Sequence, residues 1–578
     1  MLPLSQDSRV LDAGCGWGTL TFQLAKSYKH VWAFDRSDCG TEFIKIRSKQ
    51  DKVDNIIPVR GNVLKLPFCD NYFDLVVLNG VLEWIGQDDE SLDPLIVQQR
   101  LLKEFFRVLK PKGYLYVGIE NRWSATYFLG EPEGHVNLRF ISLLPRFTAR
   151  AYHRIVKKTP YSVYTHSKRN YVRMFKKAGF NGVSAYSPIP QYHHYSNMVP
   201  LDNFYACKYY VDKLFSHKKK LAVFFNKIVK AFYLYRLMPF FAPCFSFIVA
   251  KSDKDPVSAL LSQDLGEKFL GQKRKASFIL NSSTNHIVLI PFIAKAKQPL
   301  FILKTCRYVD NDSFTKLDDV YKYLKELNSD FINKSIPDII YAGKFWNRQV
   351  IIERAVTGKN IDSFVKRGIN IAANKHNAKN IKIVLDWITK FNQVTKNSEI
   401  KISQESLNNY ILPVKEAIER AIAPELKEQA LKRVNELEDS SLGKAMPLVF
   451  QHRDFGPSNI LLDGATVKVF DWELSQKSAE PLYDVFYFIS RYCYLMYYDP
   501  NKHGVPYFHT LAQYTEKTFF QGSGFMHELL SSQIKQYCQS LNIDINLAKI
   551  LFLWQQAGKN NNPGIVDLFF SKEDRFIL

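Results

Sequence analysis

The segment that most restricts the possible folds of this chain is residues 447–484, PLVFQHRDFGPSNILLDGATVKVFDWELSQKSAEPLYD. Its first apolar run ends in a His-Arg-Asp triplet whose last residue is Asp454, and Asn459 follows five positions later. A second apolar run, 467–470, leads directly into Asp471. We expect both runs to be short buried strands, because each is bounded by turn residues. The segment therefore places two carboxylates and one amide at strand ends.

This set of side chains matches the requirements of phosphoryl transfer. One carboxylate accepts the proton of the attacking hydroxyl, and an amide and a second carboxylate hold Mg²⁺ against the phosphates of ATP. Asp454 is the candidate catalytic base, and Asn459 and Asp471 are the candidate metal ligands. We expect His452 to brace the loop rather than take part in the chemistry. A lone HxD most often caps a turn, but three matches in order at strand ends favour a kinase-like domain.

The residues after Asp471 narrow the type of kinase. Trp472-Glu473 follows the magnesium aspartate, and PLYD stands at 481–484. The pattern HxDxxxxN, then apolar-DWE, then PLYD is similar to that of the aminoglycoside phosphotransferase/choline kinase family. The resemblance covers roughly residues 270–560. It implies a bilobal α+β kinase-like fold, ATP and Mg²⁺ as cofactors and a small-molecule hydroxyl as acceptor, but it does not identify the acceptor.

Further signals of the same kind precede this segment. Three strand-like runs begin the second half of the chain, and Lys304 in the third matches the lysine of the family that pairs with the nucleotide phosphates. Its usual partner is a Glu on the following helix, where Asp318, Asp319 and Glu326 are all candidates and the choice stays open. Residues 349–355, QVIIERA, fit the hinge strand that meets adenine through its backbone.

The N-terminal part opens with a different nucleotide-binding pattern. Residues 9–18, RVLDAGCGWG, predict a buried strand followed by a glycine-rich turn and a helix that begins near Thr19. The turn region contains Asp12, Gly14, Gly16 and Gly18. The next strand ends in Asp35, and an acidic side chain there can accept both ribose hydroxyls of a nucleoside.

The segments that follow specify the fold further. They are GNVLKLPF at 61–68, a strand FDLVVLNGVLEWI at 73–85 and VLKPKGYLYVGIEN at 108–121. In this order they resemble a class I S-adenosylmethionine-dependent methyltransferase over about residues 7–190, which implies a Rossmann-like seven-stranded mixed sheet. An NAD-binding Rossmann unit is the competing interpretation, and LPF and LKPKG argue against it.

The resemblance implies roles for individual residues of this part. Asp12, Gly14, Gly16 and Gly18 would cradle the methionine part, Asp35 would hold the ribose, Asn62 and Val63 would flank the adenine, and Asn79, Gly80 and Glu83 would line the methyl-transfer end. The family usually has Asp in place of Asn62, but an amide carbonyl can still accept a hydrogen bond. No residue declares itself as a general base. Each of His135, His153, His166, His193 and His194 is more often a satisfied surface or core residue than a catalyst.

Composition limits the partners and the compartment. A length of 578 residues is too great for one ordinary core. A formal net charge of +22 predicts attraction to nucleotides, phosphorylated glycolipids, an anionic membrane surface or nucleic acid, although lysine-rich coding from an A/T-rich genome explains it equally well. Eight cysteines without a CxxC pair indicate a reduced compartment without structural zinc. We expect a cytoplasmic protein, and the abrupt entry into the first strand suggests that the sequence begins at an internal or late start.

Residues 203–240 alternate aromatic and basic side chains. This pattern predicts an amphipathic basic segment that either lies on an anionic membrane or, as we favour, forms an insertion with a solvated basic face. The window 231–250 is apolar, but Arg236 and two prolines argue against a membrane span, and its end is predicted to be the last strand of the methyltransferase sheet.

The predicted domains follow from these assignments. They are a methyltransferase core (1–200), a basic amphipathic helical insertion plus the last strand (201–253), a linker (254–268), a kinase-like N-lobe (269–360) and a C-lobe with a helical acceptor region (361–578).

The combined prediction is a bifunctional transferase that methylates with S-adenosylmethionine and phosphorylates a hydroxyl of a sugar, glycan or lipid-linked glycan with ATP. The order of domains resembles bacterial methyltransferase/kinases of surface-polysaccharide synthesis, and peripheral contact with the inner membrane face fits that role. Two alternatives stay open: a single-activity enzyme whose other half is a binding module, and a nucleic-acid methyltransferase. LNGV in place of a (D/N)PP(Y/F) motif makes nucleic acid the less expected partner. The oligomeric state is left open.

Overall fold

The structure is a computed structural model of the chain. It describes residues 2, 4–86, 93–161, 163–215, 236–252, 276–282, 286–293, 296–306, 313–345, 348–366, 371–497, 516–520, 524–559 and 563–578. The chain divides into two compact units: unit 1 is Met1–Asp312 with Ile340–Ala355, and unit 2 is Ser313–Ile339 with Val356–Leu578. The predicted linker at 254–268 lies outside the described residues.

Seven of the described strands of unit 1 form the expected mixed sheet. They are β1 (Arg9–Ala13), β2 (His30–Asp35), β3 (Ile56–Arg60), β4 (Phe73–Asn79), β5 (Leu109–Glu120), β6 (Gly182–Gln191) and β8 (Cys244–Ala250). Their order is β3-β2-β1-β4-β5-β8-β6, with β8 antiparallel to both neighbours and β1 parallel to β2 and β4. The prediction that 231–250 ends in the last strand of this sheet is confirmed by β8.

One sequence-based boundary in this sheet is wrong. The strand predicted over 73–85 ends at Asn79, because Gly80 turns the backbone with a left-handed φ of 70°. A short 3₁₀ turn, η1 (Leu82–Trp84), follows. The turn leaves Glu83 at the end of β4 rather than inside the strand.

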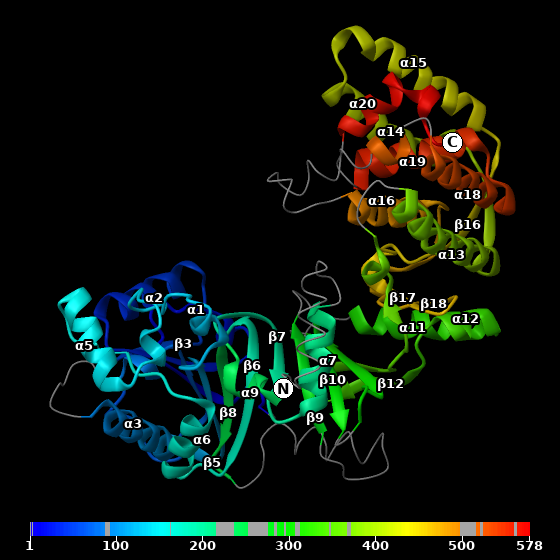
Figure 1. Ribbon diagram of the computed structural model, residues 1–578. Coiled ribbons are helices and arrows are strands. Elements are labelled where there is room, and N and C mark those ends of the chain that lie inside the picture. The colour runs from blue at the N-terminus through cyan, green and yellow to red at the C-terminus, as the bar shows by residue number, and fades with distance from the viewer. Residues whose placement is uncertain are drawn as a thin grey trace. The chain divides into compact units, whose positions relative to one another are not determined.

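Helices cover both faces of this sheet (Figure 1). α1 (Thr19–Ala25) and α2 (Asp38–Gln50) pack on one face through Phe22 and Ile44. α3 (Pro94–Val108) and α6 (Lys168–Lys177) pack on the other through Phe105 and Phe175. The sequence also sets where α3 begins, because the Asp93 side chain accepts from the N–H of Leu95 and a proline opens the first turn.

The sheet continues beyond these seven strands. β7 (His194–Pro200) is antiparallel to β6, and β9 (Ala276–Ser282) pairs with β7 at Asn197↔Asn281 and Met198↔Leu280. Beyond β9 follow β10 (His286–Ile293), β11 (Phe301–Cys306), β13 (Arg348–Arg354) and β12 (Ile339–Phe345). Among the described residues, one sheet of 13 strands therefore joins the strands of the predicted methyltransferase core to the strands predicted for the nucleotide-binding lobe.

Unit 2 is mostly helical, as predicted for 370–445. Its longest described helices are α13 (Ile371–Thr395), α14 (Gln404–Ala421), α15 (Pro424–Ser441), α16 (Tyr483–Tyr497) and α18 (Phe525–Leu541), with α11 (Ser313–Glu326), α12 (Asp330–Ser335), α19 (Ile545–Trp554) and α20 (Pro563–Ser571). Two small sheets are described: β14 (Lys359–Asn360), β17 (Ile460–Asp463) and β18 (Thr466–Val469), and β15 (Ser398–Lys401), β16 (Ala445–Gln451) and β19 (Gln476–Ala479). Trp472 is fully buried against Phe391 and Phe450, which fixes the loops between these strands to the helical core.

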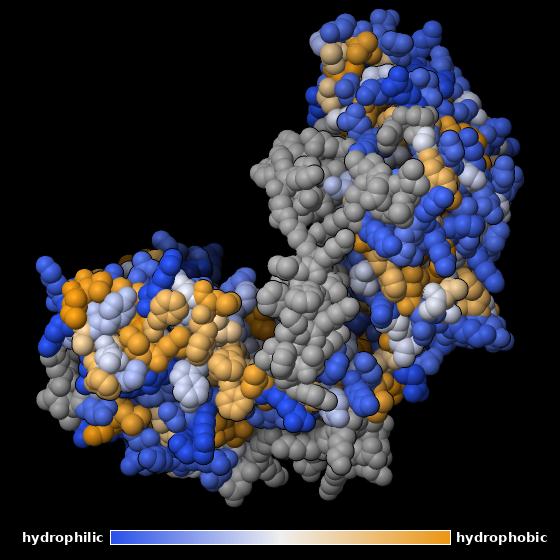
Figure 2. Space-filling view, in the orientation of Figure 1, coloured by the Kyte–Doolittle hydropathy of each residue, from blue (hydrophilic) through white to orange (hydrophobic). Residues whose placement is uncertain are grey.

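One helix of unit 1 exposes apolar side chains. α5 (Arg146–Lys157) leaves 74% of Phe147 and 78% of Ile155 exposed, two turns apart on the same side of the helix. Figure 2 shows apolar side chains gathered over this part of unit 1. Within the residues that the structure describes, none of the helices combines the length and apolar character that crossing a bilayer requires. Of the predicted basic insertion, α7 (Phe204–Phe215) and α9 (Met238–Phe241) are described, and residues 216–235 lie outside the described residues.

Candidate active sites

The loop after β16 brings two of the predicted phosphotransfer residues together. Asn459 donates through Nδ2 to Oδ2 of Asp454 at 2.9 Å and to the Asp454 carbonyl oxygen at 2.9 Å. The second carboxylate oxygen, Oδ1, accepts from the hydroxyl of Tyr487 at 2.9 Å. The candidate base is thus held by two side chains, one of which, Tyr487, was not predicted from the sequence.

Asp484, the second residue of α16, anchors the backbone of this loop. Its carboxylate accepts from the N–H groups of His452 at 2.6 Å and Arg453 at 2.9 Å. The carboxylate is fully buried, and this burial raises the pKa of Asp484 to about 7 against the opposing effect of the two N–H donors. In the sequence, Asp484 is notable only as the last residue of the PLYD pattern, and its anchoring contact appears only in three dimensions.

His452 links the two candidate loops. Its Nε2 lies 3.0 Å from the carbonyl oxygen of Phe470, the residue before Asp471, and its ring lies 4.5 Å from that of Trp472. This is the position that a brace between the Asp454 loop and the Asp471 turn would take. The prediction that His452 has a supporting role therefore has a structural basis.

Asp471 stands at a strained turn directly after β18. Its φ is 72°, a left-handed conformation that costs a non-glycine residue roughly 1 kcal/mol. The N–H of Phe470 donates to the carbonyl oxygen of Asn459 at 3.2 Å, so the backbones that carry the two predicted metal ligands are in contact. Because the Asn459 amide nitrogen is committed to Asp454, its amide oxygen is the atom that remains for a cation. Carboxylate and amide oxygens suit Mg²⁺.

Lys304 is buried in β11 beside a carboxylate on a neighbouring strand. Its Nζ lies 3.2 Å from Oε1 of Glu353, a residue of the predicted hinge strand. Both side chains are more than nine-tenths buried, and a buried ammonium requires such a partner. Of the acidic candidates on the following helix, Asp318 pairs with Lys322 at 2.6 Å. The sequence rule directed attention to that helix and missed Glu353.

The glycine turn after β1 has the backbone conformation of a ligand cradle. Gly14, Gly16 and Gly18 all have left-handed φ values, of 76°, 51° and 76°. A Cβ on Gly14 would meet the side chain of Val81 at 2.5 Å, whereas a Cβ on Gly16 would meet no described atom within 4 Å. Asp35 closes the turn by accepting from the N–H of Gly16 at 2.8 Å. The turn therefore fits the predicted cofactor, with open space at its middle glycine.

The remaining predicted cofactor residues have local structural roles. Asp12 is buried and accepts from the hydroxyl of Thr21 at 2.6 Å, and its burial raises its pKa to about 6. Asn62 is exposed and its Oδ1 accepts from the N–H of Leu64 at 2.9 Å, so the carbonyl expected to meet adenine already holds its own turn. Val63 packs against the main core of the sheet.

The predicted methyl-transfer end contains an acidic cluster that the sequence did not reveal. Glu83 is fully buried after β4, and Glu120 is the last residue of β5. His135 Nε2 lies 3.8 Å from Oε1 of each of these two glutamates. Burial, followed by the nearby Glu120 carboxylate, raises the pKa of Glu83 to about 8, while Glu133, Glu120 and Glu83 raise the pKa of His135 against its own burial.

Residues around the cluster fix its geometry. The hydroxyl of Tyr192 donates to Glu120 Oε1 at 2.9 Å, and Glu133 contacts His135 Nδ1 at 2.5 Å. The signal that could have found Glu120 is its place at the end of a strand parallel to β4, because the carboxyl ends of parallel strands share one edge of the sheet.

The other candidate histidines have structural surroundings. His153 is buried and bonds to the carbonyl oxygen of Thr159, and His166 is buried against Gln98, with a pKa that burial lowers to about 3. His193 and His194 lie exposed at the β6–β7 turn. Of the five histidines, His135 is the one that faces the carboxylate cluster.

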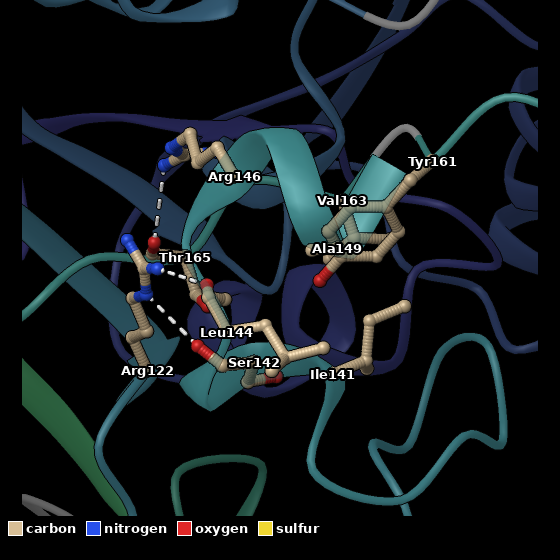
Figure 3. Close-up of a pocket in the computed structure, with 9 residues that line it drawn as sticks. All are labelled: Arg122, Ile141, Ser142, Leu144, Arg146, Ala149, Tyr161, Val163 and Thr165. Atoms are coloured by element: carbon tan, nitrogen blue, oxygen red, sulfur yellow. Dashed lines mark hydrogen bonds between the residues drawn. The ribbon is translucent and has the colours of Figure 1, made fainter. Parts of the chain in front are cut away.

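A small basic pocket lies between η2 (Ile141–Leu143), α5 and the residues Tyr161, Val163 and Thr165 (Figure 3). Arg122 donates to the carbonyl oxygens of Ser142 at 2.8 Å and Leu144 at 2.6 Å, and Arg146 donates to that of Thr165 at 3.4 Å. None of the described residues that line this pocket is acidic. The two guanidinium groups therefore hold the segment after β5 together through its backbone.

Comparison with protein families agrees with this division of the chain. Residues 11–117 match the family model for a methyltransferase domain, and residues 402–500 match that for the phosphotransferase enzyme family. The chain therefore carries two transferase domains. The first match lies on the strands of the Rossmann-like mixed sheet, and the second lies on the part of unit 2 that contains Asp454, Asn459 and Asp471.

The curated relatives named here each match less than a third of the chain. An uncharacterised protein of Haemophilus influenzae is 32% identical over 113 residues, which are 19% of this chain and 42% of that protein. The demethylmenaquinone methyltransferase of Lactococcus lactis is 36% identical over 107 residues, 18% of this chain and 38% of the enzyme, and that of Lactiplantibacillus plantarum is 27% identical over 184 residues, 31% of this chain and 73% of the enzyme. The chain spans about two fifths of the length of the first curated relatives it matches.

Solved structures similar to the chain include an S-adenosylmethionine-dependent methyltransferase from Methanosarcina mazei. It is 17% identical with a TM-score of 0.27, and the match covers 43% of this chain and 95% of that one. The YcgJ protein of Bacillus subtilis is also 17% identical, with a TM-score of 0.25 over 43% of this chain and 94% of that one.

Proposed function

We propose that this protein is a bifunctional transferase that phosphorylates a hydroxyl of a sugar or glycan with ATP and methylates an acceptor with S-adenosylmethionine. The observation that carries the proposal is the Asp454 loop. Its carboxylate is hydrogen-bonded to Asn459 at 2.9 Å, and Asp484 anchors the backbone on which it stands. The open glycine turn after β1 supports the methyltransferase activity.

In the phosphoryl transfer, Asp454 accepts the proton of the acceptor hydroxyl, and its contacts with Asn459 and Tyr487 fix the direction of the carboxylate. The Asn459 amide oxygen and Asp471 would hold Mg²⁺, which when bound neutralises charge on the phosphates of ATP. Lys304 binds nucleotide phosphate, with Glu353 orienting its ammonium. The protein thus contributes mainly positioning and charge, which is what a loose phosphoryl transition state needs.

In the methyl transfer, the glycine turn and Asp35 would hold S-adenosylmethionine, which supplies an electrophilic methyl group. The Asp35 carboxylate already accepts from the N–H groups of Gly16 and Ser37, and a carboxylate has lone pairs left for the ribose hydroxyls. Asn79 ends β4 on the same edge, and its Oδ1 is buried without a hydrogen-bond partner in the described part of the chain. That oxygen is available to a donor on the cofactor or acceptor.

The proposed acceptor is a lipid-linked glycan of bacterial surface-polysaccharide synthesis, and α5 supports this choice. The helix presents Phe147 and Ile155 to solvent together with the exposed Arg150 and Arg154. Exposed apolar side chains beside basic ones suit an anionic membrane interface. The net charge of +22 also favours binding to an anionic membrane. Contact with the membrane would be peripheral and would bring the acceptor to the enzyme.

Calorimetric titration with Mg-ATP and, separately, with S-adenosylmethionine tests the two activities at their first step. Binding of both ligands supports the proposal. Asp471→Ala should abolish only the binding of Mg-ATP, and Gly16→Ala should abolish only the binding of S-adenosylmethionine. Binding of Mg-ATP alone would make the methyltransferase half a recognition module.

The order of the two reactions is tested with glycan acceptors and radiolabelled S-adenosylmethionine. We expect methyl incorporation to require ATP and to be lost in Asp454→Asn, because the methyl acceptor is then the phosphorylated product. Equal methylation with and without ATP would refute this coupling and leave two independent activities.

A further inference from the structure

Three side chains at the methyl-transfer edge of unit 1 converge on one point. One carboxylate oxygen of Glu83, one of Glu120 and one ring nitrogen of His135 lie within 4.8 Å of one another. His135 Nε2 is 3.8 Å from Oε1 of each glutamate. They come from three segments: the turn after β4, the end of β5 and the loop after α4 (Ala125–Phe128). Such convergence of two carboxylates and an imidazole is the arrangement of a cation site with three protein ligands.

Glu83 supplies an independent indication of a missing ligand. The residue is fully buried, yet neither carboxylate oxygen has a hydrogen-bond partner among the described residues. Oε2 of Glu120 is likewise buried without a partner in the described part of the chain. A buried carboxylate without donors is costly, and it faces a second carboxylate that makes it costlier still. A bound cation would satisfy these oxygens and cancel the repulsion.

The surroundings of His135 are those of a metal ligand. Glu133 is 2% exposed, lies 2.5 Å from Nδ1 of His135 and also accepts from the backbone N–H groups of His135 and Val136. A histidine that donates through one ring nitrogen to a fixed carboxylate presents the other nitrogen as a lone pair, the usual outer-shell arrangement of protein metal sites. Here the presented nitrogen is Nε2, which faces Glu83 and Glu120.

We propose that Glu83, Glu120 and His135 bind one divalent transition-metal cation, of the Mn²⁺ type, at the acceptor end of the methyltransferase unit. Two carboxylates and one imidazole suit Mn²⁺, Fe²⁺ and Zn²⁺. The donor set leaves coordination positions for an oxygen of the acceptor. That role in methyl transfer rests on the proposed function, whereas the binding of the cation does not.

The test uses the full-length protein carrying Asp471→Ala, so that the candidate magnesium site of unit 2 is removed. After chelator treatment and dialysis, Mn²⁺ alone is titrated without nucleotide, and free Mn²⁺ is followed by electron paramagnetic resonance. We expect one Mn²⁺ per chain. Glu83→Gln, Glu120→Gln and His135→Ala should each weaken binding by more than about tenfold.

Two further variants separate ligation from general electrostatics. Glu133→Gln should weaken Mn²⁺ binding by about 10–100-fold, because His135 loses its orienting carboxylate. Glu131→Gln removes an exposed carboxylate two residues before Glu133 and should leave Mn²⁺ affinity unchanged. Far-ultraviolet circular dichroism of each variant shows whether the fold is kept. The isosteric Glu83→Gln decides the matter if His135→Ala unfolds.

The outcomes distinguish this site from the proposed function. No Mn²⁺ binding by the parent protein, or the same affinity after Glu83→Gln, would overturn the cation site and leave a cluster that shares protons. Mn²⁺ binding without S-adenosylmethionine binding would uphold the site and refute methyl transfer. Mn²⁺ binding that Glu131→Gln weakens as much as Glu83→Gln would also overturn it.

Discussion

The carboxylate of Asp484 accepts a 2.6 Å hydrogen bond from the backbone N–H of His452, 32 residues earlier in the chain. Through this bond the start of α16 fixes the loop that carries Asp454. The chemistry of the loop is thereby tied to the protonation and size of a buried side chain that no substrate would touch.

The buried Asp484 predicts a pH dependence of stability. Its folded pKa is raised to about 7 from 3.8, so between about pH 4 and pH 7 the folded state holds a proton that the unfolded chain has lost. Stability therefore falls as pH rises through this window, by at most about 4 kcal/mol from this group. Thermal melts between pH 4 and pH 8 should show a smaller decline in Asp484→Asn, and identical slopes for the two proteins would contradict the assignment.

Asp454→Asn should abolish phosphoryl transfer while sparing ATP binding. Removal of a positioned base typically costs about 10²–10⁴-fold in rate. Tyr487→Phe is the matched variant: it removes one hydrogen bond to the carboxylate and should cost about tenfold or less. Single-turnover kinetics with labelled ATP measure both, and near-wild-type turnover in Asp454→Asn would show that the role is misassigned.

Two substitutions at Asp471 should have the same effect on nucleotide binding but different effects on the stability of the fold. Asp471→Ala and Asp471→Gly both remove the carboxylate, so both should lose Mg²⁺-dependent nucleotide binding in calorimetry. The φ of 72° favours glycine, so the Gly variant should be about 1 kcal/mol more stable than the Ala variant in denaturant titrations. Equal stability of the two variants would argue against the left-handed turn.

The glycine turn gives a prediction with a control in the other unit. Gly16→Ala points a methyl group into open space where the cofactor is expected, so it should weaken S-adenosylmethionine binding in a protein that still folds. Gly464→Ala has a similar φ, 63° against 51°, and equally open surroundings in the described structure, so it should cost similar stability and leave cofactor affinity unchanged.

Gly14→Ala is expected to behave differently from both. Its new Cβ would meet Val81 at 2.5 Å, so the main effect should be a lower melting temperature of unit 1 rather than a direct loss of cofactor affinity. Thermal melts measure the stability of the three variants, and calorimetry measures their affinity for S-adenosylmethionine. Unchanged cofactor affinity in Gly16→Ala would show that the turn is not part of the cofactor-binding site.

The local patterns of the sequence predicted the parts of both sites that lie within one strand and its following turn. The glycine turn after β1, the Asp454 loop and the turn at Asp471 all belong to this class, because turn residues and buried runs carry their own signal. The contacts that complete the sites join residues distant in sequence. Glu353 meets Lys304 from a neighbouring strand, and His135 meets Glu83 across 52 residues. No spacing rule encodes such contacts.

The pairing of β7 with β9 was unpredictable for a related reason. Strand edges join through backbone groups that every residue possesses, so the side-chain pattern does not announce which edges meet. The sequence separates the two sheets by a polar stretch that is typical of a linker, and the structure nevertheless joins them at Asn197↔Asn281 and Met198↔Leu280.

That junction has a consequence for how the protein could be divided. If the chain were cut in the region 253–275, β7 would keep β6 but lose β9, and it would display an unpaired edge next to the buried Val199, while β9 would display another. Bare edges of this kind recruit other chains and aggregate. Each half therefore covers a strand edge of the other during folding. A gene encoding either half alone would yield a protein prone to misassembly.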